Sequence, residues 1–116
     1  MLPRIHRLKK KKDFDVVFKG KKGAEEDGLV FRFVPNKLEY GRFGFVIGKN
    51  VSSRATVRNL VRRRLSALVR KHALEEKYWI DGIFVAKPGL ELKKNKELEE
   101  IMIRLVKKIG LPQGAA

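Results

Sequence analysis

The chain has 116 residues, of which 43% are hydrophobic, so we expect one folded domain with a buried core. Its 28 lysines and arginines against 13 acidic residues give a formal net charge of +15, which predicts a polyanionic partner: nucleic acid first, an anionic membrane surface second. The chain has no cysteine, no apolar run near the ~20 residues that span a bilayer and no signal-peptide pattern, so we expect a cytoplasmic protein without disulfides or cysteine-based zinc sites.

The N-terminal half is expected to hold one short helix and two strands. After an irregular basic segment over residues 1–12, apolar residues on one helical face predict a helix over 13–20. A polar, glycine-rich loop should follow over 19–28. Alternating apolar residues then predict strands over 29–34 and 42–48, which we expect to pair as an antiparallel hairpin.

The C-terminal half is expected to hold two amphipathic helices, over 56–72 and 98–109, on either side of a strand over 79–86. We expect a single domain over 1–112 and a frayed tail over 113–116. The order α-β-β-α-β-α, with room for one additional short strand, predicts an α/β (α+β) two-layer sandwich in which helices pack on a small β-sheet.

The positive charge lies in two segments. Residues 1–22 contain nine basic and two acidic side chains, and residues 49–71 contain eight basic and no acidic ones. The remaining residues carry 11 basic and 11 acidic side chains, so the two segments account for the whole net charge. Because an ordinary solvated surface mixes both signs, this segregation predicts that the two segments form parts of one anion-binding surface.

The helix predicted over 56–72 follows Ser52 and Ser53, either of which could cap it, and carries a row of arginines. Arg54, Arg58 and Arg62 are four residues apart and therefore line up along one side. Guanidinium groups bind phosphate through paired hydrogen bonds and stay charged, whereas a merely solvated helix face normally alternates Arg with Glu. No acid occurs on this helix, which favours phosphate binding. The apolar stripe on the other side is expected to contain Val57, Leu60, Val61, Leu65 and Leu68.

The phenylalanines allow two interpretations. Phe14 and Phe18 on the first helix, and those on the two strands, are either ordinary core residues or the lining of a groove where unpaired bases stack.

Catalytic patterns are missing from the sequence. His6 and His72 do not have the spacing of a catalytic motif. Asp13 and Asp15 lie near the start of a helix, where capping is the simplest role for them. We therefore predict no catalytic residue and no metal ligand, although acidic residues could hold Mg²⁺ through waters beside a bound RNA.

Several short sequence segments occur in the same order in a known family: RLKK at 7–10, DFDVVFK at 13–19, RFG at 42–44, VRNLVRR at 57–63 and DGIFVAKP at 81–88. In this order and spacing they resemble the protein subunit of bacterial ribonuclease P, over most of residues 5–110. The resemblance implies a small α/β fold with a left-handed βαβ crossover, against the usual right-handed rule. It also implies binding to the catalytic RNA of ribonuclease P and to the 5′ leader of precursor tRNA, while the RNA performs the Mg²⁺-dependent hydrolysis that matures the tRNA 5′ end.

The resemblance further implies roles for individual residues. Contacts to the catalytic RNA are expected from Arg54, Arg58, Asn59, Arg62, Arg63 and Arg70. A cleft for the leader is expected from Phe14, Phe18, Arg32, Phe33 and Lys49. Additional phosphate contacts are expected from Arg7, Lys9, Lys10 and Lys12. The chain departs from the family pattern at Leu60, where the second arginine of an Arg-Asn-Arg motif is expected, and at Arg32, where an aromatic residue is often found.

The function expected from residues and resemblance together is that of a non-catalytic subunit of a ribonucleoprotein endoribonuclease. Its partners would be ribonuclease P RNA and precursor tRNA, without DNA or membrane. The alternative is a ribosomal or other structural RNA-binding protein, which has similar charge but needs no groove for a leader. A DNA-binding module would need the arginine helix in a major groove, and the sequence offers no dimer seam to support it.

Overall fold

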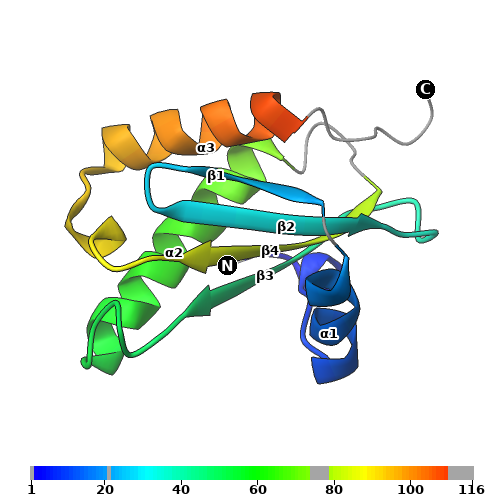
Figure 1. Ribbon diagram of the computed structural model, residues 1–116, viewed down its shortest axis with the longest axis horizontal. Coiled ribbons are helices and arrows are strands. Elements are labelled where there is room, and N and C mark those ends of the chain that lie inside the picture. Colours follow the sequence, from blue (N-terminus) through cyan, green and yellow to red (C-terminus); the bar gives the residue numbers. More distant parts are fainter. Residues whose placement is uncertain (1, 21, 74–78, 110–116) are drawn as a thin grey trace.

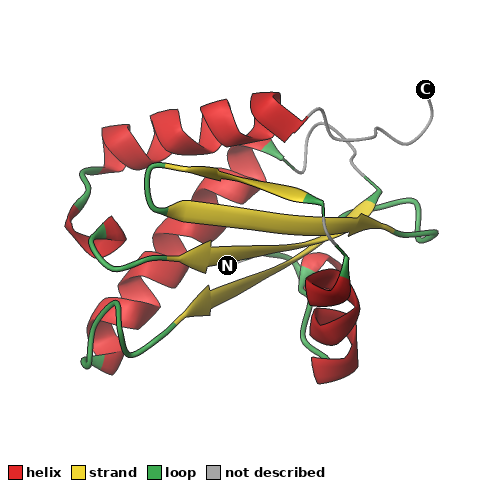
Figure 2. Ribbon diagram, in the orientation of Figure 1, coloured by secondary structure: helices red, strands yellow, loops and turns green. Residues whose placement is uncertain are grey.

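The computed structural model describes residues 2–20, 22–73 and 79–109, which form a four-stranded sheet with helices on both faces (Figure 1). The helices are α1 (Lys11–Lys19), α2 (Ala55–His72) and α3 (Asn95–Ile109), with short 3₁₀ turns η1 (Arg4–His6) and η2 (Leu90–Leu92). The strands are β1 (Gly23–Glu26), β2 (Leu29–Pro35), β3 (Arg42–Ile47) and β4 (Ile80–Ala86). The predicted fold class is confirmed, and β1 is the additional short strand (Figure 2).

The strand order is β1-β2-β4-β3, with β2 antiparallel to β1 and β4, and β3 parallel to β4. The predicted hairpin between 29–34 and 42–48 is therefore wrong, because β4 lies between those two strands. The reason is the burial of β4, whose side chains are buried on both faces, as is typical of a central strand. The loop predicted over 19–28 is wrong as well, since it contains β1.

The connection from β3 through α2 to β4 is left-handed. Figure 1 shows β3 and β4 running in the same direction, with β4 on the side of β2 and α2 passing behind the sheet. The opposite hand occurs in about 98% of such crossovers. The crossover implied by the family resemblance is thus confirmed, and it places α2 on the face opposite α1.

Two apolar clusters hold the layers together. The larger one joins the sheet to α2 and α3 and includes Phe31, Phe33, Phe43 and Phe84. The smaller one joins α1 and the N-terminal segment to the other face through Leu8, Val17 and Ile83. One side of the sheet therefore carries most of the core, while the other is covered by a single short helix in the described part of the chain.

The helix boundaries and the buried stripe of α2 differ from the prediction in detail. α1 begins at Lys11, α3 begins at Asn95, and α2 begins at Ala55 without a side-chain cap from either predicted serine. The buried stripe of α2 is Val61, Leu65 and Val69, so Leu60, predicted as core, is 49% exposed. The predicted tail over 113–116 lies outside the described residues. No helix in the described ranges is long and apolar enough to cross a membrane.

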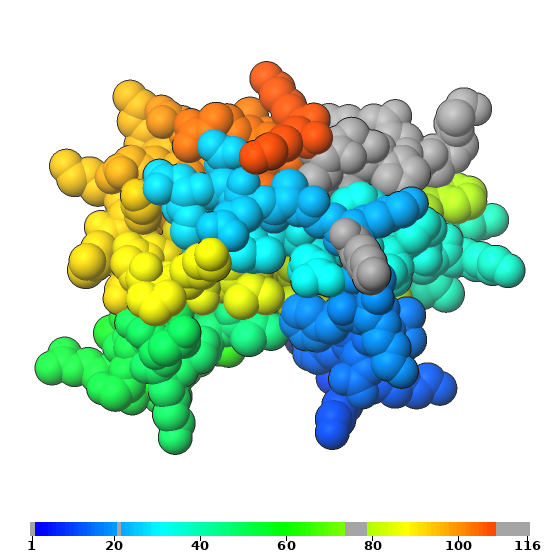
Figure 3. All heavy atoms as spheres, viewed as in Figure 1, coloured from blue at the N-terminus to red at the C-terminus, as the bar shows by residue number. Residues whose placement is uncertain are grey.

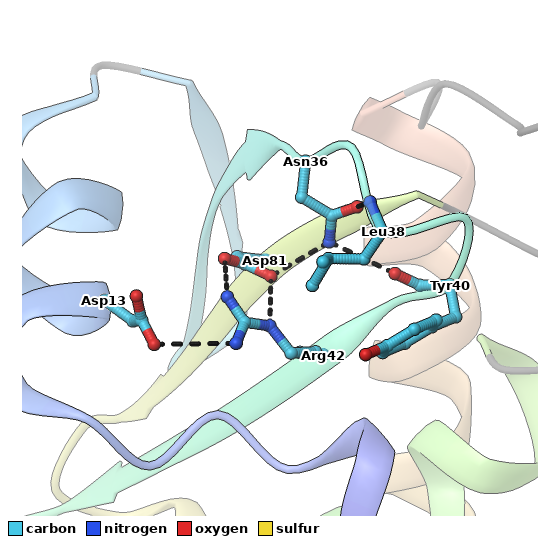
Figure 4. Close-up of polar contacts among 6 residues, drawn as sticks. All are labelled: Asp13, Asn36, Leu38, Tyr40, Arg42 and Asp81. Carbon is cyan, nitrogen blue, oxygen red and sulfur yellow. Dashed lines mark hydrogen bonds and ion pairs between the residues drawn. The ribbon is translucent and has the colours of Figure 1, made fainter.

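A buried carboxylate at the start of β4 connects three elements (Figure 4). Asp81 is 7% exposed and accepts two hydrogen bonds from Arg42, from Nε at 2.9 Å and from Nη2 at 2.6 Å. Asn36 donates to the same carboxylate at 2.9 Å, and Asp13 of α1 lies 3.5 Å from Nη1 of Arg42. The hydrogen bonds to Asp81 hold the pKa of Arg42 above its usual value. Asp13, predicted as a helix cap, makes no side-chain cap bond and instead faces this arginine.

We predict that Asp81→Asn lowers the free energy of unfolding by about 2–3 kcal/mol, because it leaves the guanidinium of Arg42 partly buried without its bidentate partner. Urea denaturation followed by circular dichroism measures this. The matched control is Glu25→Gln, which breaks the exposed pair with Lys87 and should cost less than about 1 kcal/mol. Equal losses in both variants would contradict a special role for Asp81.

Candidate nucleic-acid interface

The N-terminal half of α2 presents arginines whose charges are not neutralised. Within residues 2–20, 22–73 and 79–109, Arg54, Arg58, Arg62 and Arg63 form no ion pair. Arg58 donates from Nη1 to the carbonyl of Ser52 at 2.9 Å, and Arg62 donates from Nη1 to Oδ1 of Asn59 at 2.8 Å. Each of these bonds orients a guanidinium while leaving its remaining N–H groups for a phosphate.

In the C-terminal half of α2, three of the four basic side chains meet acceptors on α3 or just before it. The fourth, Arg70, predicted to contact RNA, is exposed and forms no ion pair within the described residues. Glu99 lies 2.8 Å from Nζ of Lys71 and 2.7 Å from Nε2 of His72. The hydrogen bond from Lys71, followed in size of effect by that from His72, holds the pKa of Glu99 below its usual value. Arg64 donates to Oδ1 of Asn95 at 2.7 Å and to the carbonyl of Lys93, so it connects α2 to α3 and does not supply the charge missing at Leu60.

The basic N-terminal segment runs beside β3. The N–H of Leu8 donates to the carbonyl of Phe43 at 2.9 Å, and Arg7 donates from Nε to the carbonyl of Leu2 at 2.6 Å. The predicted phosphate-binding residues Lys9, Lys10 and Lys12 follow and are exposed. Across the described ranges these three lysines form no ion pair.

The two basic segments come together at the edge of β3. Figure 3 shows the start of α1 (dark blue) and the start of α2 (green) projecting from the same lower side of the molecule, with a notch between them. A cavity of about 240 Å³ beside β3 is lined by Arg7 and Lys9 from the first segment and by Arg62 from the second. The structure thus brings together the two segments that sequence alone could only suggest belong to one surface.

Several charges elsewhere on the described surface are paired. Glu25 bonds Lys87, and Asp27 lies 3.1 Å from Nζ of Lys93. On α3, Arg104 and Lys108 lie 3.0 and 3.7 Å from carboxylate oxygens of Glu26. These cations are neutralised by neighbouring carboxylates, unlike the arginines at the start of α2 and Lys9, Lys10 and Lys12.

The residues predicted to line a cleft are only partly brought together. Phe14 packs over Gly44, where a Cβ would collide with its ring, and Phe18, one helical turn later, is 41% exposed. Both belong to α1, on the less covered face of the sheet. Lys49 is exposed but follows the far end of β3, beyond Ile47.

Two residues predicted to line the cleft, Phe33 and Arg32, have structural roles elsewhere. Phe33 is 5% exposed in the core on the face opposite α1, so its assignment to the cleft is wrong. Arg32 lies on the face of α1, and its Nη2 donates to the carbonyls of Phe18 at 3.2 Å and Gly20 at 2.5 Å. Its guanidinium therefore closes the C-terminal end of α1, which is a favourable place for a cation.

The two histidines, which have no catalytic motif spacing in the sequence, each have a structural partner. His6 pairs through Nδ1 with the carbonyl of Gly41 at 2.7 Å, and His72 pairs with Glu99. Leu2, Phe45 and Ser66 also line the cavity beside β3. Phe45 is one of the strand phenylalanines that the sequence left open as core or groove lining, whereas Leu2 was not singled out. The sequence could not show that these residues lie together, because the cavity forms between three segments far apart in the chain.

A small α/β domain with a neutral scaffold and two cationic segments meeting at one sheet edge has the properties of an RNA-binding protein. The family model described as Ribonuclease P matches residues 2–110, and the chain belongs to this family. Its partner is accordingly ribonuclease P RNA, and it is a protein component of an endoribonuclease.

Individual relatives support the same family assignment. The ribonuclease P protein component of Synechococcus elongatus is 32% identical over 112 residues, covering 89% of this chain and 92% of the relative. That of Legionella pneumophila strain Corby is 38% identical over 92 residues, covering 79% of this chain and 78% of the relative. The solved structure of the Staphylococcus aureus RNase P protein superposes with a TM-score of 0.82 at 19% identity, covering 91% and 96% of the two chains. Nothing in these comparisons supports the alternative of a ribosomal or other structural RNA-binding protein.

Proposed function

We propose that the chain is the non-catalytic subunit of ribonuclease P, which binds the RNA subunit and the 5′ leader of precursor tRNA while the RNA hydrolyses the phosphodiester bond. The observation that carries this proposal is the cationic surface formed by the N-terminal half of α2 and the N-terminal segment. Family membership supplies the partner, and the unpaired guanidinium groups supply the means of binding it.

The cationic surface and the face of the sheet beside α1 differ in chemistry, and we assign a different RNA contact to each. The arginines of α2, with Asn59 and Arg70, and the lysines of the N-terminal segment would hold the RNA subunit. The face beside α1, with Phe14 and the exposed Phe18, would hold the leader, because an exposed aromatic ring can stack on an unpaired base. Magnesium would be bound by the RNA, and the protein would lower the concentration required by screening phosphate repulsion.

We predict that the chain restores cleavage of precursor tRNA by the RNA subunit at low magnesium and that Arg58→Ala with Arg62→Ala impairs this. The double variant should also bind the RNA subunit more weakly and reduce the slope of log affinity against log salt by roughly 0.7–0.9 for each lost contact. Filter binding across a salt series and single-turnover cleavage measure both effects.

The matched control is Arg104→Ala with Lys108→Ala, which removes the same charge from the paired side of the molecule. It should leave affinity and slope nearly unchanged. No stimulation by the wild-type chain at low magnesium would overturn the proposed function, whereas equal effects of the two double variants would overturn only the assignment to α2.

We predict that Phe18→Ala weakens binding of precursor tRNA with a long leader by about tenfold, the loss of roughly one stacked base, without changing affinity for tRNA that lacks a leader. Because Phe18 is exposed, the free energy of unfolding should change little. Val16→Ala, also exposed on α1, is the control. A large loss of stability, or a loss of affinity independent of the leader, would show that Phe18 does not contact the leader.

A further inference from the structure

The cavity beside β3 lies where the two basic segments meet, and its lining is mostly apolar. Its walls are formed by Leu2, Leu8, Phe14, Phe43, Gly44 and Phe45, and its polar lining residues are Arg7, Lys9, Arg62 and Ser66. We propose that this cavity receives one unpaired nucleobase of the RNA subunit, with the phosphate of that nucleotide held by the cations at the rim. This inference rests on the proposed function and names a specific contact within it.

The small size of the cavity favours a single ring system, such as one base, over a larger ligand. Its volume of about 240 Å³ is slightly below the range of about 300–1,000 Å³ typical of small-molecule pockets. Phe45 is partly buried and stacks on Phe84, with ring centroids 5.8 Å apart and 15° between the planes, so this wall is rigid. A rigid aromatic wall is a surface on which a base can stack.

The backbone at the cavity offers hydrogen bonds to the edge of a base. β3 is an edge strand, and the carbonyl of Phe43 points outward to the N–H of Leu8. Residues two apart on a strand direct their backbone groups to the same side, so the N–H and C=O of Phe45 also point outward. In the part of the chain that the structure describes, the N-terminal segment pairs with β3 only at Phe43. Phe45 thus presents a donor and an acceptor at an open edge, the pattern that a base edge matches.

The charges at the rim favour a nucleotide over an apolar peptide. Arg7, Lys9 and Arg62 all line the cavity, and no carboxylate does. Arg7 and Arg62 each use one N–H group in a bond to Leu2 or Asn59, which fixes their guanidinium groups and leaves other N–H groups available. An apolar interior with a cationic rim is complementary to a base attached to a phosphate. Because paired bases are stacked within a helix, the base should come from a loop, bulge or joining strand.

The direct test uses adenosine 5′-monophosphate and ribose 5-phosphate as probes of the full chain, observed by NMR of ¹³C-labelled methyl groups. Adenosine 5′-monophosphate should shift the methyl signals of Leu2 and Leu8 in a saturable way, while those of Leu92, which is 83% exposed and does not line the cavity, should stay in place. Ribose 5-phosphate, which lacks the base, should leave all three unchanged. No shift with the nucleotide, or equal shifts with both probes, would overturn the proposal.

The second test uses the RNA subunit itself. Phe45→Ala should weaken its binding by about tenfold without changing the salt slope, because a stacking contact and not a phosphate contact is lost. Phe45→Trp keeps an aromatic wall and should stay within about twofold of wild type, and Leu92→Ala is the control. Unchanged affinity for Phe45→Ala would contradict the base site, whereas failure of the wild-type chain to bind the RNA subunit at all would contradict the proposed function.

Discussion

The bidentate pair between Arg42 and Asp81 fixes the geometry on which both RNA-facing regions depend. It joins the starts of the parallel strands β3 and β4, and Asn36 adds the end of β2 to the same carboxylate. Removing both charges from water is costly, and the several hydrogen bonds to Asp81 are what offset that cost. Through Asp13 the same network reaches α1, and together with the apolar contacts of Val17 it holds this helix over the sheet.

The charge distribution separates structural from functional ions. Many of the acidic residues neutralise a neighbouring cation, at the Arg42 pair and along β1, α3 and the end of α2. In the described structure, the arginines at the start of α2 and Lys9, Lys10 and Lys12 lack such partners. Their mutual repulsion disfavours the free fold and is relieved when a polyanion binds, so RNA binding and folding stability should support one another.

The sequence predicted the helices and the three longer strands because their apolar spacing is regular. It did not predict β1, which contains one alanine and two glutamates, pairs with β2 and forms ion pairs with Lys87 after β4 and with Arg104 of α3. Strand pairing was misjudged because the partner of both β2 and β3 comes later in the chain. The assignment of both Arg32 and Phe33 to one cleft conflicts with strand alternation, since adjacent residues face opposite sides of a sheet. The arginine row was found because its four-residue spacing is local, whereas the cavity beside β3 needs three distant segments.

Binding through one cationic surface requires that the N-terminal segment and α2 contact the RNA subunit together. Mass spectrometry of lysine acetylation and arginine modification, with and without bound RNA subunit, measures this directly. We predict protection of Lys9, Lys10 and Lys12 together with Arg58, Arg62 and Arg63, while Lys93 and Arg104 on the paired side remain as reactive as before. Protection of only one of the two segments, or equal protection of the paired side, would contradict it.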